Sequence, residues 1–346
     1  METRALGPSD LAVSVFGLGT MTFGAESDEE TSHAILDRYY DAGGRFIDTA
    51  DVYSRGVSEE IIGRWLDSTA RREEMLIATK ARFPMGDGTD MRGAGAGYLK
   101  RALDASLNRL GIDVIDLYQM HAWDPEVPIE ETLGTLNSFV ETGKVRFIGV
   151  SNYTGWQIER TVQMANQNGW QSPVSLQPQY NLLARDIELE VLPAAIENGL
   201  GILPWSPLGG GWLTGKYSRD SRPTGETRLG EDPNRGVEAY DRRNTERTWK
   251  VLDAVKETAN QRGVTMSQVA LNWLRNRPSV SSVLLGVRTV DQLDDNLAAL
   301  EWDLTDGEMG ELTGVSAPGI PDYVQGFLDD LAGVDIWRRL GTVAGD

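Results

Sequence analysis

Residues 45–53 read RFIDTADVY. Phe46 and Ile47 are apolar, which is typical of a short strand buried on both faces. Asp48 lies inside that apolar run, and a buried carboxylate is costly unless a charged or hydrogen-bonding group meets it. From this segment alone, a capping or salt-bridged aspartate explains the pattern as well as a functional one does. The rest of the chain must decide between the two.

Short apolar strands recur on both sides of this segment, each followed by an amphipathic helix. Besides the strand in 45–53, we expect strands at 13–18, 75–78, 114–120, 145–150, 174–176, 201–203 and 283–285. Two helix starts carry residues at capping-box spacing, Ser27 with Glu30 and Thr154 with Gln157. This alternation is typical of a parallel α/β fold, and eight strands predict a single (β/α)8 TIM barrel. A long polar loop, about 216–244, would follow the seventh strand.

A doubly wound sheet is the alternative fold, but its phosphate-binding fingerprint is missing. Gly17-x-Gly19 has Thr22 where the third glycine belongs, and the glycine-rich stretch 93–97 follows no strand. Both segments are therefore more consistent with ordinary loops.

The composition excludes several classes of function. The formal net charge of -19 argues against nucleic acid or an anionic membrane as a partner. There are no cysteines and only two histidines, so we expect no disulfide and no metal site. No signal peptide or membrane-spanning run is evident, so we expect a cytoplasmic protein whose charge reflects a saline habitat or a solubility preference.

Polar and aromatic side chains stand at the ends of the expected strands, and the active sites of such barrels form where these ends meet. Each residue alone has a structural explanation, such as a surface lysine or a core histidine. Their coincidence at one end of a barrel favours a functional site. The set is Asp48, Tyr53, Lys80, His121, Ser151, Asn152, Gln177, Trp205, Gly286 and Arg288.

Four of these side chains suit the protonation of a developing alkoxide. We expect Tyr53 to be the general acid, although its unperturbed pKa is about 10. Lys80 at ~4 Å would supply roughly the 4 kcal/mol that lowers this pKa by about three units. Asp48 would keep Lys80 charged, and His121 would orient a carbonyl oxygen. The hydride must come from a cofactor, because no side chain supplies one.

Seven segments in order resemble the signatures of the aldo-keto reductase superfamily. They are FIDTADVYSRGVSEEIIG, IATK, LYQMHAWD, GVSNY, LQPQYNLLARD, PWSPLGGGWLTGKY and GVRTVDQLDDNL, between about Val13 and Leu300. In having tryptophan at position 205, the chain resembles the branch of the superfamily that contains potassium-channel beta subunits and many bacterial reductases. The resemblance implies reduction of an aldehyde or ketone to an alcohol with NADPH, with Asp48, Tyr53, Lys80 and His121 as the catalytic tetrad.

The resemblance also implies a set of cofactor contacts. Ser151, Asn152 and Gln177 would hold the nicotinamide carboxamide, and Trp205 would stack on the ring. The pyrophosphate would lie on 206–210 and the adenosine half on 286–296, where Gln292 has a second interpretation as a helix cap with Thr289. The further contacts are Gly19, Thr20, Met21, Asp48, Ser206, Pro207, Leu208, Gly209, Gly210, Lys216, Gly286, Arg288, Gln292, Asp295 and Asn296.

The substrate is a small carbonyl compound whose identity the sequence leaves open. Phe23, Trp123, Tyr153 and Trp212 could line an apolar pocket, although core packing explains each of them equally well. We expect a single domain, 1–346, whose C-terminal extension at 303–346 lies near the barrel mouth. That extension carries Tyr323, Phe327 and Trp337.

Two other functions remain alternatives. A glycoside hydrolase on the same fold would use two carboxylates, for which Asp48, Asp51 and Asp124 are available. The lysine expected beside Asp48 and the cofactor motifs argue against it. A non-catalytic subunit that binds or senses NADPH is also compatible with the sequence.

Overall fold

The computed structural model describes residues 1–225, 227–232, 234, 236–319 and 321. These residues form two compact units. Unit 1 comprises 1–178, 190–205 and 281–293, and unit 2 comprises 179–189, 206–280 and the described residues from Asp294 onward. The expectation of one domain with an extension at 303–346 stays a prediction.

Unit 1 contains a sheet that, among the described residues, has eight parallel strands in the order β10-β3-β4-β5-β6-β7-β8-β9. Ser281 and Leu284 donate backbone hydrogen bonds to Ile202 and Pro204, joining the two ends of this order. The (β/α)8 prediction is therefore confirmed. The strands are β3 (Phe16–Gly19), β4 (Phe46–Asp48), β5 (Leu76–Ala81), β6 (Ile115–Met120), β7 (Val145–Ser151), β8 (Ser175–Gln177), β9 (Gly201–Ile202) and β10 (Val283–Gly286).

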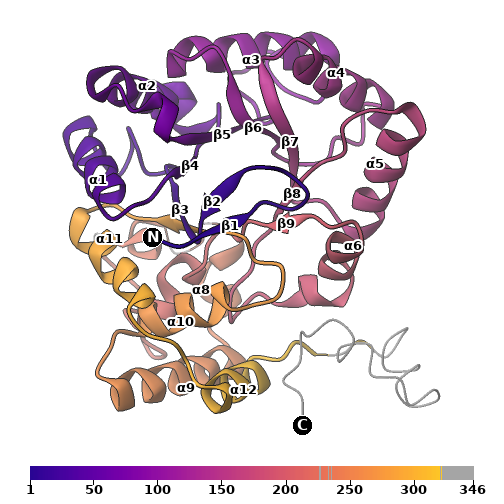
Figure 1. Cartoon of the computed structure of the whole chain (residues 1–346). Helices are drawn as coiled ribbons and strands as arrows, with labels where there is room; N and C mark the ends of the chain where they lie inside the picture. Colours follow the sequence, from indigo (N-terminus) through magenta and orange to yellow (C-terminus); the bar gives the residue numbers. More distant parts are fainter. Residues whose placement is uncertain (226, 233, 235, 320, 322–346) are drawn as a thin grey trace. The chain divides into compact units, whose positions relative to one another are not determined.

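Helices surround the sheet of unit 1 (Figure 1). In the third of them, Leu99, Leu103, Ser106 and Leu110 are buried at helical spacing, so one face packs inward while the other meets solvent. The helices are α1 (Glu29–Asp41), α2 (Val57–Thr69), α3 (Ala96–Leu110), α4 (Ile129–Glu141), α5 (Gly155–Asn168) and α6 (Val191–Glu197), with short 3-10 turns η1 (Tyr53–Gly56) and η2 (Arg72–Glu74).

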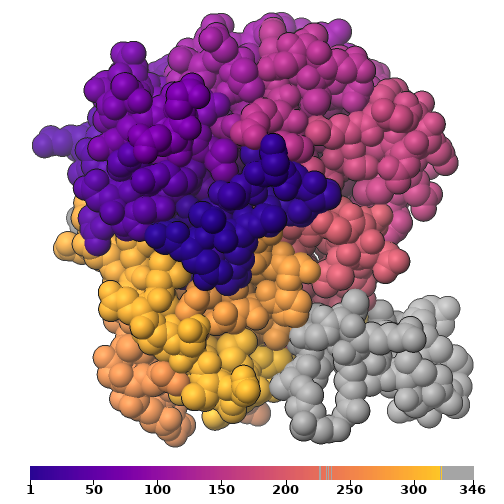
Figure 2. Space-filling model, in the orientation of Figure 1, coloured from indigo at the N-terminus to yellow at the C-terminus, as the bar shows by residue number. Residues whose placement is uncertain are grey.

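An N-terminal hairpin covers the amino end of the barrel. The predicted strand at 13–18 is in fact two strands. β2 (Ala12–Ser14) pairs with β1 (Thr3–Ala5), and β3 joins the barrel after a break at Val15, whose N–H bonds to Glu2. Leu6, Leu11 and Val13 cluster with barrel side chains such as Phe46 and Val174 near the strand starts. The hairpin, in indigo, lies over the near face of unit 1 in Figure 2, so this end of the barrel is closed.

The predicted helix caps have different outcomes. The capping box at Ser27 is wrong, because Asp28 is the N-cap and accepts from the Thr31 N–H, while Ser27 donates to the carbonyl of Arg288. The cap at Thr154 is confirmed, since the Gln157 side chain accepts from the Thr154 N–H at 2.9 Å. Serine and aspartate both serve as caps, so adjacent candidates leave the helix start uncertain by one residue.

Unit 2 is helical. It contains η3 (Asp186–Leu189), η4 (Gly209–Thr214), α7 (Arg228–Glu231), η5 (Gly236–Glu238), α8 (Tyr240–Arg243), α9 (Glu246–Arg262), α10 (Met266–Arg275), η6 (Ala298–Leu300) and α12 (Asp306–Val315). The first half of α11 (Val290–Leu297), up to Leu293, is assigned to unit 1 and the rest to unit 2. Arg262 on α9 pairs with Glu308 on α12. The expected tail aromatics Tyr323, Phe327 and Trp337 lie outside the described residues. No helix in the described part of the chain is long and apolar enough to cross a membrane.

Candidate active site

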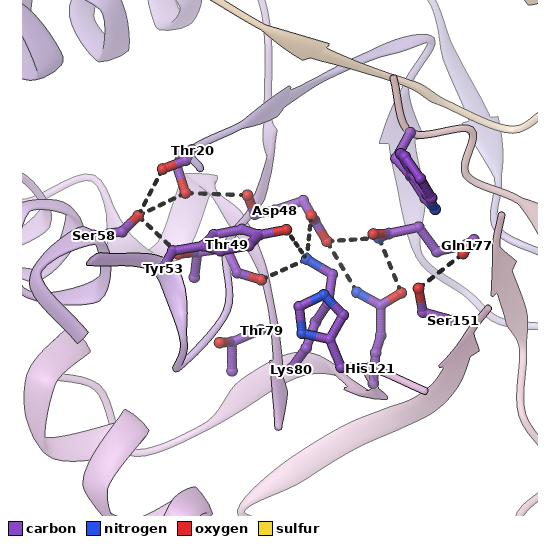
Figure 3. A network of polar contacts seen from close by, with 12 residues as sticks. Thr20, Asp48, Thr49, Tyr53, Ser58, Thr79, Lys80, His121, Ser151 and Gln177 are labelled. Carbon is purple, nitrogen blue, oxygen red and sulfur yellow. Dashed lines mark hydrogen bonds and ion pairs between the residues drawn. The ribbon is translucent and has the colours of Figure 1, made fainter. Parts of the chain in front are cut away.

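Lys80 lies at the centre of a polar network at the carboxyl ends of the strands (Figure 3). Its side chain is fully buried, and its ammonium donates to Asp48 Oδ2 at 2.6 Å, to the Thr49 carbonyl at 2.7 Å and to Tyr53 Oη at 3.3 Å. Three acceptors satisfy the three N–H bonds of an ammonium. The Asp48 and Tyr53 contacts outweigh burial and raise the pKa of Lys80, so the amine stays charged.

Asp48 is held by two amides besides Lys80. Gln119 Nε2 and Gln177 Nε2 each donate to Asp48 Oδ1 at 2.9 Å, and Gln177 Nε2 also contacts Gln119 Oε1. Gln119 was missed by the sequence analysis. It stands two residues before His121 in a buried strand, so the two side chains share the interior face of the barrel, and a polar residue in that position was the available signal.

Tyr53 is presented by a tight turn after β4. Ser54 and Arg55 have φ of 49° and 53°, and Gly56 has φ of 96°. A side chain at Gly56 would meet Arg109 Cδ at 2.7 Å, so this position needs glycine for both conformation and space. Ser54 Oγ donates to the Phe23 carbonyl at 2.8 Å and fixes the turn. The backbone thus directs the phenol toward Lys80.

The pKa of Tyr53 is raised above its ordinary value, mainly by burial. The charge of Lys80 lowers it, but the carboxylates of Asp48 and Asp51 act in the opposite direction. The expectation that Lys80 brings this pKa near neutrality is therefore wrong for this arrangement. Tyr53 keeps its proton at neutral pH, and Lys80 stabilises the phenolate that would form when the proton leaves.

His121 is neutral. Burial, followed by the charges of Lys80 and Arg82, lowers its pKa well below the ordinary value. Its ring lies 5.9 Å from the Tyr53 ring and 4.5 Å from the Phe83 ring. Nδ1 is buried and has no hydrogen-bond partner among the described residues. A neutral imidazole beside a phenol can donate an N–H to a carbonyl oxygen.

The predicted nicotinamide residues form a chain of hydrogen bonds along β7, β8 and the end of β9. Ser151 Oγ donates to the Gln177 carbonyl at 2.8 Å, and Asn152 Nδ2 donates to the His121 carbonyl at 2.9 Å. Trp205 Nε1 donates to Asn152 Oδ1 at 3.0 Å, which holds the partly exposed indole. Gln177 Oε1 makes no hydrogen bond within the described part of the chain, so it remains available as an acceptor.

The other expected cofactor residues of unit 1 have different surroundings. Thr20 is buried and donates to the Asp48 carbonyl, whereas Met21 and Gly286 are exposed and Gly19 is partly exposed. Arg288 lies 3.5 Å from Glu26. Thr289 Oγ1 accepts from the Gln292 N–H, which is one half of the expected capping box. The other half is wrong, because Gln292 Oε1 accepts from the Arg288 N–H rather than from that of Thr289.

Within unit 2, a carboxylate occupies the turn expected to bind pyrophosphate. Buried Glu238 accepts from Ser206 Oγ and from Gln179 Nε2, and its second oxygen has no partner among the described residues. Ser206, Gly209 and Gly210 all have positive φ, and Pro207 and Leu208 complete the turn. An anion on this turn would meet a like charge. Lys216 is exposed, Asp295 accepts from Thr265 and Gln268, and Asn296 is buried.

The expected substrate residues divide into two pairs. Phe23 and Trp212 are both 0% exposed, so their side chains belong to the cores of their units and cannot line an open pocket. Trp123 and Tyr153 are in ring contact at 5.3 Å, and Trp123 also contacts the exposed Trp156. Trp123 and Tyr153 come from the loops after β6 and β7, as do His121 and Asn152, whereas Trp156 lies in the first turn of α5.

The comparisons with known proteins agree with this geometry. The model of the aldo/keto reductase family matches residues 15–317. The chain belongs to the aldo/keto reductase family. This membership leaves the glycoside hydrolase alternative without support, and the expected tetrad of the reductases is brought together in unit 1.

Three similar relatives show the range of the family. The uncharacterized oxidoreductase YrpG of Bacillus subtilis is 36% identical, over 88% of this chain and 92% of the relative. A probable voltage-gated potassium channel subunit beta of rice, Oryza sativa, is 34% identical, over 87% and 92%. The aldo-keto reductase yakc [NADP(+)] of Schizosaccharomyces pombe is 34% identical, over 90% of each. The expected likeness to the channel-subunit branch is confirmed.

Proposed function

We propose that the chain reduces an aldehyde or ketone to an alcohol with NADPH as the hydride donor. The observation that carries the proposal is the buried ammonium of Lys80, which contacts both the Asp48 carboxylate and the Tyr53 hydroxyl. A reductase needs a proton donor whose conjugate base is stabilised, and this contact supplies both parts.

The roles of the side chains follow from their contacts. Tyr53 Oη donates its proton to the oxygen of the substrate carbonyl, and the charge of Lys80 stabilises the phenolate left behind. Asp48, fixed by Gln119 and Gln177, holds Lys80 in place. Neutral His121 donates an N–H to the same carbonyl oxygen and orients it. When bound, NADPH supplies the hydride for the carbonyl carbon.

The residues around the tetrad fit a nicotinamide cofactor. The partly exposed Trp205 indole, anchored through Asn152, offers a flat apolar surface, and Gln177 Oε1 offers an acceptor for a carboxamide. The NADP(+) in the name of the fission yeast relative and the position of Arg288, two residues before α11, favour NADPH over NADH. A guanidinium can bind the additional 2'-phosphate with charge-assisted hydrogen bonds.

A panel of aldehydes and ketones, assayed by the loss of reduced-cofactor absorbance with NADPH and NADH in parallel, tests the proposal. We expect turnover of some carbonyl compounds and at least about tenfold tighter binding of NADPH, because hydrogen bonds to a charged group each contribute about 1.5–3 kcal/mol. Arg288→Ala should remove most of that preference without changing the affinity for NADH. Absence of turnover across the panel would contradict the proposal.

A non-catalytic NADPH-binding subunit is the second candidate, favoured by the name of the rice relative. The same assay distinguishes the two functions. A non-catalytic subunit would bind NADPH, detectable by quenching of tryptophan fluorescence, yet turn over none of the carbonyl compounds. The intact Asp48, Tyr53, Lys80 and His121 contacts favour the reductase.

A further inference from the structure

Arg82 has an unusual backbone conformation beside the candidate active site. It follows directly after β5, two residues beyond Lys80, and has φ of 134°, a region that residues with side chains rarely adopt. Its carbonyl accepts from the Gly93 N–H at 2.9 Å, which fixes the chain at this point. Strained positions of this kind occur preferentially at functional sites.

The guanidinium of Arg82 is partly buried and makes no hydrogen bond or ion pair within the described part of the chain. Its Nε is buried without a partner. This is notable in a protein with 52 acidic and 33 basic residues. Asp124, in the loop after β6, forms no ion pair with it; Asp124 Oδ1 and Oδ2 accept from the N–H groups of Glu126 and Ala94.

Arg82 lies close to the proposed reaction site. Its Cζ is 5.6 Å from the centre of the Phe83 ring, and that ring is 4.5 Å from the His121 ring. Burial lowers the pKa of His121 and raises that of Tyr153, and the charge of Arg82 acts downward on both, so Arg82 lies within electrostatic reach of these two side chains after β6 and β7. The Phe83 ring therefore links this cation to the imidazole that would orient the carbonyl.

An unpaired, partly buried cation is costly, and an anionic ligand would remove the cost. We infer that Arg82 binds an anionic group of the substrate, and that the preferred substrates are carbonyl compounds that carry a carboxylate. Arginine suits this role, because its planar fork binds a carboxylate through two parallel N–H donors. The inference rests on the proposed carbonyl reduction and specifies its substrate class.

The matched pair 4-carboxybenzaldehyde and methyl 4-formylbenzoate tests the inference, because the two aldehydes differ in charge and little in shape. We expect the wild-type protein to prefer the carboxylate in kcat/KM. Arg82→Gln should lower kcat/KM for the carboxylate about 10- to 100-fold, which is the loss in affinity expected when a hydrogen bond to a charged group is removed. The same change should alter kcat/KM for the ester less than about threefold. Arg92→Gln, at an exposed position in the same loop, is the control with the same change in net charge.

Three other outcomes would decide whether Arg82 recognises the carboxylate. Equal losses for both aldehydes would overturn the inference and assign Arg82 a role through His121 alone. An unchanged preference in Arg82→Gln would also overturn it while leaving carbonyl reduction intact. Binding of the product analogue 4-(hydroxymethyl)benzoate, measured by tryptophan fluorescence, tests anion recognition by Arg82 separately from carbonyl reduction. If it binds wild type about tenfold more tightly than Arg82→Gln and neither aldehyde is reduced, the proposed function fails but anion recognition by Arg82 stands.

Discussion

Lys80 determines the geometry of the site at the scale of single residues. Its ion pair with Asp48 is completely buried, whereas Lys144 and Asp104 form a pair of the same 2.6 Å length with side chains 46% and 58% exposed. Water screens the exposed pair and not the buried one. Lys80 and Lys144 therefore allow a buried ion pair to be compared with an exposed one of the same length.

We predict that Lys80→Met lowers carbonyl turnover at least about 100-fold, because the phenolate of Tyr53 loses its stabilising charge. It should also cost roughly 3 kcal/mol of stability, since Asp48 is left buried without its cation. Asp48→Asn should have a smaller effect on both, because Lys80 keeps the Thr49 and Tyr53 contacts. Steady-state kinetics and urea unfolding measure these effects.

Lys144→Met is the control, and we expect it to change stability by less than about 1 kcal/mol and to leave turnover unchanged. A Lys80→Met protein with wild-type rates would show that the charge of Lys80 does not assist the proton donor.

At the residue scale, the sequence predicted which side chains meet but not their energetics. Asp48, Tyr53, Lys80 and His121 follow strand ends, and the register of a parallel barrel brings strand ends together. The raised pKa of Tyr53 was not predictable, because it depends on the depth of burial and on Asp51 as well as Lys80. The bonding of Gln177 to Asp48 likewise depends on the position of Gln119.

At the scale of elements, a second buried charge cluster connects the Tyr53 turn to helices α2 and α3. Asp51 Oδ2 accepts from Tyr98 Oη on α3 at 3.0 Å, and Asp51 Oδ1 has no partner among the described residues. Glu59 on α2 pairs with Arg109 on α3 at 2.7 Å. Burial, followed by the charges of Asp51 and Glu59, raises the pKa of Tyr118 on β6, so this phenol lies within electrostatic reach of the cluster. Arg109 therefore pairs with Glu59, while Asp51 makes no ion pair with any described residue.

Burial, together with the negative charge of Glu59, raises the pKa of Asp51 to about 7. The folded state therefore holds a proton that the unfolded state loses above about pH 4, and stability falls as the pH rises toward 7. We predict that Asp51→Asn removes this loss, so that the variant gains about 2 kcal/mol relative to wild type between pH 5 and 7.5.

Urea unfolding at several pH values measures this change. Asp67→Asn, at an exposed position on α2, is the control and should show no such trend. A stability difference between Asp51→Asn and wild type that is constant with pH would contradict the assigned protonation of Asp51.

The order of strands and helices in the barrel was predictable, because the spacing of apolar residues in each segment indicates whether it is a strand or a helix. The N-terminal hairpin was not, since residues 13–18 read as one apolar strand. Only the tertiary contacts of Leu11 and Val13 beneath the barrel show that the run is broken at Val15. The start of α1 was missed for a similar reason, because Ser27 and Asp28 are equally good caps in isolation.

At the scale of the whole molecule, the dominant feature is the net charge of -19. Like charges at this density repel one another in the compact state. At 0.1 M, dissolved salt largely screens the repulsion between charges more than about 10 Å apart. We predict that the midpoint of thermal unfolding rises by about 5 °C between 0.02 and 0.5 M KCl. Differential scanning calorimetry measures this shift, with sucrose of equal osmolality as the control. A midpoint that falls or stays constant would show that local ion pairs outweigh the net repulsion.

The most direct test of the central claim is the rate of carbonyl reduction by Tyr53→Phe, measured together with its affinity for NADPH. The change removes only the hydroxyl that contacts Lys80. We predict a loss in kcat/KM of at least about 100-fold, an NADPH affinity within about threefold of wild type, and unchanged circular dichroism. Tyr40→Phe, which removes an exposed hydroxyl bonded to Glu74, should behave as wild type. Near wild-type turnover in Tyr53→Phe would show that Tyr53 is not the proton donor.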